Sequence, residues 1–228
     1  MKKKALIVSL KGSELSRKEK ILLSKEKPWG VILFKRNLES FKQIKKLTSK
    51  IRSLTKDRKF PIIIDEEGAK VSRLDNIIHH KVTANFFGNL FKRDKKFCLN
   101  IYKKYIEALS NVLKDLGINV NTIPVLDVLR KHTSKIISNR SFSKDEKIVK
   151  ELGKLTIEYL HSKKIAAVIK HIPGHGAALT DSHKKMPKVS LNLKKLNNVD
   201  FYPFKLHKAK LAMTAHILYT KIDEKNVA

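Results

Sequence analysis

The sequence alternates short apolar runs with longer charged stretches, and this alternation limits the possible folds more than any other feature. The apolar runs are nearly continuous, as expected for strands of a parallel sheet that helices cover. We predict strands at 5–10, 30–34, 61–67, 118–128, 165–171 and 211–219, and helices at about 14–25, 38–54, 95–116 and 145–162. These six strand–connection units indicate either a (β/α) barrel or an open doubly wound sheet.

Polar side chains follow the last four apolar runs, at the point where each run ends. Asp65 and Glu66 follow PIII, Asp127 follows IPVL, Lys170 and His171 follow AAVI, and His216 follows AMTA. Barrel enzymes build their sites from the carboxyl ends of several strands, whereas a doubly wound sheet concentrates its site at one switch point. We therefore predict an α/β fold, namely a TIM-type (β/α) barrel that forms a single domain over residues 1–228. This barrel is expected to be incomplete at its C-terminus, with about six of the eight β/α units of the full fold.

The formal net charge of +29 raises the question of nucleic-acid binding. The basic residues comprise 42 lysines and only eight arginines, whereas base and phosphate recognition favours the forked donors of arginine. The lysines occur in nearly every predicted helix and form no single stripe interleaved with aromatic residues. We interpret them as solvated helix faces and expect no specific nucleic-acid partner, although weak, salt-sensitive attraction to polyanions would follow in any case.

Three further observations bear on the cellular compartment. Cys98 is the only cysteine, which excludes an intramolecular disulfide and favours a reducing environment. The apolar run at 5–10 is shorter than the core of about 7–15 residues in a secretory signal. No run approaches the ~20 apolar residues that cross a bilayer. We expect a cytoplasmic protein with no membrane partner.

The segment KHIPGHGAALTDSHKKMP, at 170–187, concentrates histidines and glycines. A zinc site is one interpretation, but Pro173 and Gly174 prevent His171 and His175 from sharing one helix face. The glutamate of an H-E-x-x-H motif is also missing. We therefore expect neither a metal ion nor another cofactor.

Asp181-Ser182-His183 is the second candidate within this segment. The carboxylate is close enough in sequence to accept a hydrogen bond from the imidazole, which would suit the histidine to proton transfer near neutral pH. On spacing alone the pattern is weak, and a turn aspartate beside an exposed loop histidine is the better explanation of it.

Two other groups of residues are candidates for ligand binding. Asp65 can accept hydrogen bonds from two sugar hydroxyls, with Arg73 supplying a donor fork nearby. The alternative is that the acids from Asp65 onward stabilise a helix N-terminus. Arg140, in the run NRSF, is either a ligand donor or an ordinary loop charge, and its sequence context leaves both open.

Five blocks, taken together and in order, resemble one family. They are IIIDEEGAKVSRL (62–74), NVNTIPVLDV (119–128), ISNRSF (137–142), VIKHIPGHGAALTDSHKKMP (168–187) and MTAHILY (213–219). They are similar to the N-terminal barrel of glycoside hydrolase family 3, and most similar to its bacterial cytoplasmic β-N-acetylhexosaminidases of peptidoglycan recycling. The resemblance extends over about residues 5–223, and the K-H-x-P-G-H-G…D-S-H string is its most specific part.

The resemblance implies a retaining β-N-acetylhexosaminidase that removes terminal N-acetylglucosamine from peptidoglycan-derived fragments. His183, paired with Asp181, would be the general acid/base, and the loop at about 173–187 would close over the sugar. The family works through a covalent glycosyl-aspartate. The residues that would hold the N-acetylglucosamine unit are Asp65, Arg73, Arg140, Lys170 and His171.

The chain departs from the family pattern in several places. The nucleophilic aspartate of the family lies in a strand beyond the M-T-A-H-I block, and neither Asp127 nor Asp223 lies in that motif. We therefore expect residues 1–228 alone to be inactive or nearly so. The other departures are Ala69 for a second glycine, Ser138-Asn139 for Gly-Asp, and Ala177 for a polar residue.

Two alternatives to this function remain. A family-3 β-glucosidase is disfavoured, because those relatives carry a carboxylate acid in a later domain rather than a histidine in this loop. A catalytically inactive protein that binds sugars or polyanions is the other alternative, and both the missing nucleophile and the net charge of +29 favour it.

Overall fold

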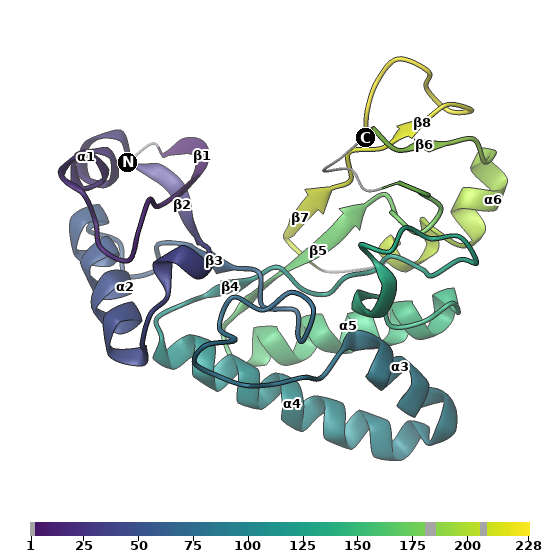
Figure 1. Ribbon diagram of the computed structural model, residues 1–228, viewed down its shortest axis with the longest axis horizontal. Coiled ribbons are helices and arrows are strands. Elements are labelled where there is room, and N and C mark those ends of the chain that lie inside the picture. The colour runs from purple at the N-terminus through teal and green to yellow at the C-terminus, as the bar shows by residue number, and fades with distance from the viewer. Residues whose placement is uncertain (1–2, 181–185, 206–208) are drawn as a thin grey trace.

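The main feature of the computed structural model is a six-stranded sheet whose strands follow one another in sequence order (Figure 1). The structure describes residues 3–180, 186–205 and 209–228. Every neighbouring pair of strands is parallel. The strands are β1 (Lys4–Ser9), β2 (Pro28–Leu33), β3 (Ile62–Ile64), β4 (Val120–Asn121), β5 (Ala166–Ile172) and β7 (Leu211–Thr214). A doubly wound sheet would reverse its strand order at a switch point, so this order confirms the prediction of an incomplete TIM-type barrel.

Helices cover the convex face of this sheet (Figure 1). They are α2 (Phe41–Thr55), α3 (Ala84–Arg93), α4 (Lys95–Asp115) and α5 (Glu146–Ser162). Side chains begin them where the sequence predicts a start: Ser40 caps α2 and Asp145 caps α5 by accepting hydrogen bonds from backbone N–H groups. The helices bury apolar residues such as Ile44, Leu113 and Leu152 against the strands. Each such burial contributes roughly 1.5–3 kcal/mol to folding, so this layer fixes the strand ends in space.

Smaller elements account for most differences from the sequence predictions. The helix expected at 14–25 consists of a short α1 (Arg17–Ile21) followed by a π-helix (Leu22–Glu26). Helix α3 and the short α6 (Leu193–Asn198) were not expected. The last apolar run divides into β7 and β8 (Leu218–Tyr219), and β8 pairs with β6 (Lys188–Val189) in a separate two-stranded sheet. Three 3₁₀ turns complete the described elements: Lys35–Asn37, Ser138–Arg140 and Tyr202–Phe204.

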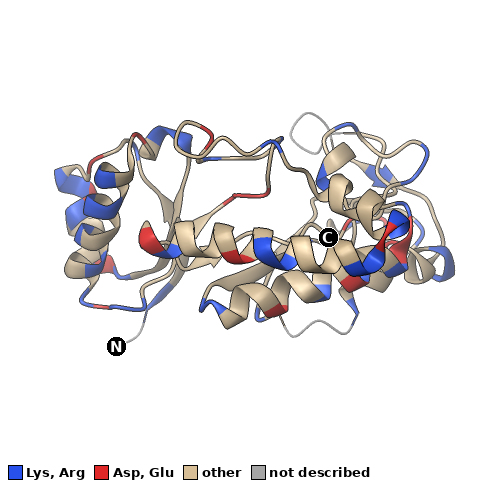
Figure 2. Cartoon of the chain, turned by 90° about the horizontal axis from the view of Figure 1, so that it is seen from below, with Lys and Arg blue, Asp and Glu red and all other residues tan. Residues whose placement is uncertain are grey.

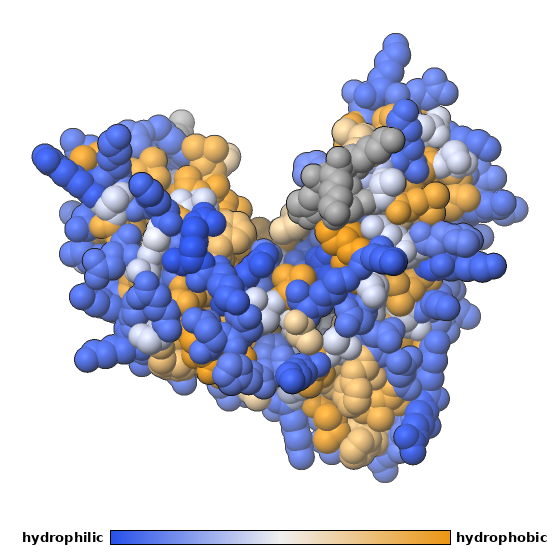
Figure 3. All heavy atoms as spheres, in the orientation of Figure 1, coloured by the Kyte–Doolittle hydropathy of each residue, from blue (hydrophilic) through white to orange (hydrophobic). Residues whose placement is uncertain are grey.

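The concave face of the main sheet is open. Ile63, Val120 and Val168 form a small buried cluster there, and a cavity of about 320 Å³ lies above it. Strand β1 at one end leaves Leu6 56% and Ile7 52% exposed. Figure 3 shows the molecule deeply notched between the β1–β2 side and the β5–β7 side, with hydrophobic residues on the walls. The sheet therefore curves as a barrel does, but among the described strands it does not close on itself.

Basic residues are distributed over the whole molecule rather than along one face. Figure 2 shows Lys and Arg on the helices at both ends of the molecule and along the helices between them. Within the part of the chain that the structure describes, no helix is long and apolar enough to cross a membrane.

Candidate active site

The polar residues predicted at the strand ends come together at one edge of the sheet. Asp65 directly follows β3, Asp127 lies on the segment after β4, and Lys170 and His171 lie near the end of β5. Thr214 ends β7 on the same side, next to the chain that carries His216. The carboxyl ends of parallel barrel strands meet at one face, which explains how residues far apart in sequence gather here.

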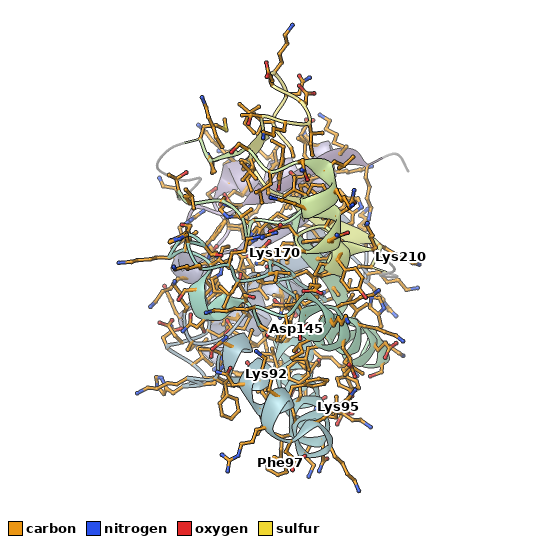
Figure 4. The ribbon with its side chains drawn as sticks, turned by 90° about the vertical axis from the view of Figure 1, so that its right-hand side faces the viewer. Lys92, Lys95, Phe97, Asp145, Lys170 and Lys210 are labelled. Carbon is orange, nitrogen blue, oxygen red and sulfur yellow. The ribbon has the colours of Figure 1, made fainter. Side chains whose placement is uncertain are left out.

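Lys170 is buried at the centre of this group, and Figure 4 shows it inside the molecule whereas Lys210 points outward. Its side chain is 2% exposed, and its Nζ lies 2.5 Å from a Glu67 oxygen and 3.7 Å from a carboxylate oxygen of Asp65. Nζ also donates a hydrogen bond to Thr122 Oγ1 at 2.8 Å. The ammonium therefore organises carboxylates around it rather than lying open at the surface.

Glu67 is the functional-site residue that the sequence analysis missed. Arg140 donates to its two oxygens from Nε and Nη2, at 2.7 and 2.9 Å, and Lys170 Nζ lies 2.5 Å from the oxygen that also accepts from Nη2. Burial opposes ionisation of Glu67, but Lys170 and Arg140 outweigh it and hold the pKa of this carboxyl below its usual range. The only signal in the sequence was its place in the D-E-E run, because both partners lie far along the chain.

Asp65 is the most accessible carboxylate of the group. Arg73 Nη2 donates to its Oδ2 at 3.1 Å, as the sequence suggested, and Thr122 Oγ1 donates to its Oδ1 at 2.5 Å. Although burial opposes ionisation, Lys170, Thr122 and Arg73 lower the pKa of Asp65. An ionised carboxylate with part of its edge exposed is an acceptor for ligand hydroxyls.

Glu66 has a structural role. Its buried carboxylate accepts hydrogen bonds from the backbone N–H groups of Arg73 and Leu74 and lies 2.8 Å from His80 Nε2. These contacts fix the loop between β3 and α3. No helix occurs between residues 65 and 83, all of which the structure describes. The alternative that these acids stabilise a helix N-terminus is therefore wrong.

Asp127 and His171 form a second buried pair. Asp127 is 0% exposed, and its Oδ2 lies 2.7 Å from His171 Nδ1. Its Oδ1 accepts from the backbone N–H groups of His175, at 2.7 Å, and of His171, at 3.3 Å. Burial opposes ionisation, but the His171 ring and these donors hold the pKa of Asp127 below its usual range.

A cavity of about 180 Å³ opens beside these residues. Arg140, the hydroxyl-bearing Thr214 and three histidines supply its polar lining, and the remaining lining comes from 136–137, 213 and 215. The cavity thus combines a guanidinium, imidazole rings and apolar side chains, which is the composition of a site for a polar small molecule. In the described parts of the chain, no three His, Cys, Asp or Glu residues are arranged to hold a metal ion.

Asp181 and His183, the predicted acid/base pair, lie outside the described residues. The chain just before them is firmly held. Tyr219 donates its hydroxyl hydrogen bond to the Gly174 carbonyl at 2.6 Å, and Thr133 donates to the Gly176 carbonyl at 2.6 Å. Both glycines are required by close approach: a Cβ on Gly176 would lie 2.0 Å from the Val128 carbonyl oxygen.

Asp200 lies beneath this segment with its side chain fully buried, and Arg130 forms an ion pair with it. Burial raises the pKa of Asp200 in spite of this ion pair. A Cβ on Gly174, whose φ is +140°, would lie 2.6 Å from the Asp200 carbonyl oxygen. The backbone at 174–176 is thus packed directly on a buried charged pair.

Comparison with known proteins identifies the family. The chain matches the glycosyl hydrolase family 3 N terminal domain over residues 2–228. Beta-hexosaminidase A of Pseudoalteromonas piscicida is 32% identical, over 90% of this chain and 36% of the relative. The Beta-hexosaminidase of Nitrosomonas eutropha is also 32% identical, over 96% of this chain and 63% of the relative. The chain therefore spans less than two thirds of the length of these curated relatives.

Solved structures show the same likeness. NagZ from Neisseria gonorrhoeae, in complex with N-trifluoroacetyl-D-glucosamine, aligns with a TM-score of 0.90 and 28% identity, over 98% of this chain and 66% of that one. A glycoside hydrolase family 3 beta-N-acetylglucosaminidase from Paenibacillus aligns with a TM-score of 0.86 and 26% identity, over 98% of this chain and 42% of that one. Because the match to the N terminal domain of this family extends over residues 2–228, the chain belongs to glycosyl hydrolase family 3.

Proposed function

We propose that this chain carries the sugar-binding site of a retaining β-N-acetylhexosaminidase that removes terminal N-acetylglucosamine from peptidoglycan-derived fragments in the cytoplasm. We further propose that residues 1–228 form one barrel domain. The observation that supports the function best is the joint arrangement of Asp65, Arg73 and His171 around buried Lys170 at one edge of the sheet. The similarity to a hexosaminidase and to a beta-N-acetylglucosaminidase supports the same substrate class.

The chemistry of the cluster suits a neutral, hydroxyl-rich ligand. Asp65 supplies an ionised acceptor edge, and Arg73 and Arg140 supply planar forks of N–H donors. Each arginine already neutralises one carboxylate, Asp65 for Arg73 and Glu67 for Arg140. The site therefore offers directed hydrogen bonds with little uncompensated charge, which fits a sugar better than an anion.

For the reaction itself, we propose that His183, oriented by Asp181, protonates the departing oxygen and then deprotonates the incoming water. A retaining mechanism also needs a carboxylate nucleophile. Asp127 is unsuited to that role, because it is fully buried and both its oxygens accept hydrogen bonds from N–H groups. Asp65 is occupied by Arg73 and Thr122.

This occupation of the nearby carboxylates favours a second candidate function, sugar binding without turnover. Both candidates share the same binding site and differ only in catalysis. We expect residues 1–228 by themselves to bind N-acetylglucosamine and to leave a chromogenic N-acetylglucosaminide intact.

Calorimetry with N-acetylglucosamine and with glucose, beside an assay of the chromogenic substrate, tests this proposal. We expect N-acetylglucosamine to bind more tightly than glucose, and Asp65→Ala to weaken binding about tenfold or more through loss of charge-assisted hydrogen bonds. Asp115→Asn, at the exposed end of α4, is the matched control and is expected to bind as the unchanged chain does. A folded chain that binds neither sugar would refute the proposed site, and rapid turnover would refute its expected inactivity.

A further inference from the structure

Asp127 is a buried carboxylate beside the ligand-facing cavity, and the proposed function assigns no role to it. It lies on the segment after β4, with a fully buried side chain, and each of its oxygens has a separate set of partners. Among the described residues, Oδ2 faces only the imidazole Nδ1 of His171, whereas Oδ1 faces the two backbone N–H groups of His171 and His175. The backbone around it is fixed as well, because Ser141 Oγ donates to its carbonyl oxygen at 2.5 Å.

This division of partners determines the tautomer of His171. An ionised carboxylate only accepts hydrogen bonds, and the pKa of Asp127 lies below its usual range. A neutral His171 ring must therefore carry its hydrogen on Nδ1, which leaves Nε2 with a free lone pair. Among the residues that the structure describes, none bonds to Nε2. The ring lines the 180 Å³ cavity together with Arg140 and His216.

The second oxygen fixes the backbone on the far side of Pro173. The hydrogen bond from His175 N to Oδ1, at 2.7 Å, is the shorter of the two backbone contacts. His175 stands directly before Gly176, whose carbonyl Thr133 holds. One carboxylate therefore fixes both the ligand-facing ring and the start of the segment that leads toward residues 181–183.

We propose that Asp127 is a positioning residue, which holds His171 in the Nδ1–H tautomer so that Nε2 accepts a hydrogen bond from a hydroxyl of the bound sugar. The sugar in this statement rests on the proposed function, whereas the tautomer does not. Through its other oxygen, Asp127 also anchors the first turn of the loop that carries the predicted acid/base pair.

The substitution Asp127→Asn separates the two roles. The amide oxygen of an asparagine would keep the position of Oδ1, where two backbone N–H groups need an acceptor. Its NH₂ group would then face His171 Nδ1 and donate to it, so the ring hydrogen would move to Nε2. The loop would stay anchored while the ring would present a donor instead of an acceptor to the cavity. An amide in place of a carboxylate beside a histidine inverts the tautomer in serine proteases in the same way.

The experiment is long-range ¹H–¹⁵N NMR of the imidazole rings in the full 228-residue chain, at a pH where the rings are neutral. His171→Gln, which removes one set of signals, assigns His171. We expect Nδ1–H in the unchanged chain, Nε2–H in Asp127→Asn, and no change in the control Asp115→Asn. An Nε2–H ring in the unchanged chain would overturn the proposal, and this reading requires only that the assignment variant His171→Gln folds.

Calorimetry with N-acetylglucosamine provides the functional readout. We expect Asp127→Asn to weaken binding about tenfold, the upper range for one neutral hydrogen bond, and circular dichroism checks that the variant is folded at the temperature of the titration. Unaltered affinity with an inverted tautomer would overturn the acceptor role of Nε2. If the unchanged chain binds no sugar but shows the Nδ1–H ring, the proposed function and the sugar-accepting role fail while the positioning by Asp127 stands.

Discussion

Lys170 and Glu67 form an ion pair at 2.5 Å in which the two side chains are only 2% and 5% exposed. Arg140 completes the group by donating twice to the same carboxylate. Two cations thus share one buried anion, with Asp65 at 3.7 Å from the ammonium as a second counter-charge. Glu67 therefore positions two of the predicted sugar-binding residues, Arg140 and Lys170.

Replacing Glu67 should therefore destabilise the fold strongly. Glu67→Gln leaves Lys170 and Arg140 buried without their anion, and breaking such a pair typically costs about 3–5 kcal/mol. Urea unfolding followed by circular dichroism measures the change. The matched control is Glu158→Gln, which breaks an exposed pair with Lys154 on α5 and is expected to change the free energy of unfolding by less than about 0.5 kcal/mol. Similar effects of the two substitutions would contradict the buried network.

Stability should fall in acid for the same reason. The pKa values of Asp65, Glu67 and Asp127 are all lowered in the folded chain. A lowered carboxyl pKa contributes stability above the unfolded value, which is about 4 for Asp and Glu, and this contribution disappears as pH falls through the folded value.

Burial raises the pKa of Asp200, so protonation of this carboxyl in acid favours the folded chain. We expect the three carboxyls with lowered pKa values to outweigh this single group. Urea unfolding at a series of pH values from 7 to 3 measures the net effect. We expect the free energy of unfolding to decrease steadily below about pH 4. Constant stability over this range would show that the three carboxylates are not paired in solution.

The glycines at 174 and 176 should not tolerate a side chain. A Cβ at Gly176 would lie 2.0 Å from the Val128 carbonyl oxygen, and Gly174 combines a φ of +140° with a close approach to Asp200. Gly176→Ala is expected to cost about 1–3 kcal/mol through overpacking and to weaken sugar binding, because it displaces the segment beside His175. Gly12→Ala is the control, since a Cβ there meets nothing within 4 Å. Equal unfolding midpoints for the two variants would disprove the tight packing.

The open concave face predicts a contrast between two isoleucines that point into it. Ile63 is 4% exposed, whereas Ile7 on β1 is 52% exposed. Ile63→Ala should cost about 2–5 kcal/mol, whereas Ile7→Ala should stay within about 0.5 kcal/mol. Denaturant titration at two protein concentrations is the measurement. A large, concentration-dependent effect at Ile7 would mean that another chain covers this face.

The alternation of apolar and charged stretches predicted the strands and most of the long helices, because these elements produce local hydrophobic patterns in the sequence. Each of the six runs assigned to strands overlaps one strand of the main sheet, in the same order. The predicted lengths and numbers of elements were wrong where tertiary contacts override the local preference of the sequence. Strand β4 ends after two residues within the long run 118–128. Helix α3 was missed, and its Gly88 is placed by the Phe142 carbonyl, which a Cβ there would approach to 1.8 Å.

In the site, too, residues with a local signal were predicted, and residues whose role depends on distant partners were not. The polar residues at strand ends were visible because each one follows its own strand, and the structure does bring Asp65, Lys170 and His171 together. The role of Glu67 depends on Arg140, which is 73 residues away in sequence, and no local pattern reports such a pair. Similarly, Asp127 contacts His171 and His175 because β4 and β5 are neighbours in the sheet, and no local pattern predicts these contacts. The roles of Asp181 and His183 stay predictions, since both lie outside the described residues.

The strictly sequential order of the main sheet has a consequence for synthesis on the ribosome. From β1 to β5, every strand pairs with the one made just before it, so the sheet can grow unit by unit as the chain emerges. The charged cluster around Lys170 cannot form in this stepwise way, because Glu67 and Asp65 emerge about 100 residues before Lys170. Proteolysis of ribosome-bound chains of increasing length would show protected helices first. During translation, these acids are therefore part of an incomplete sheet, and their ion pairs with Lys170 form only after β5 has been made.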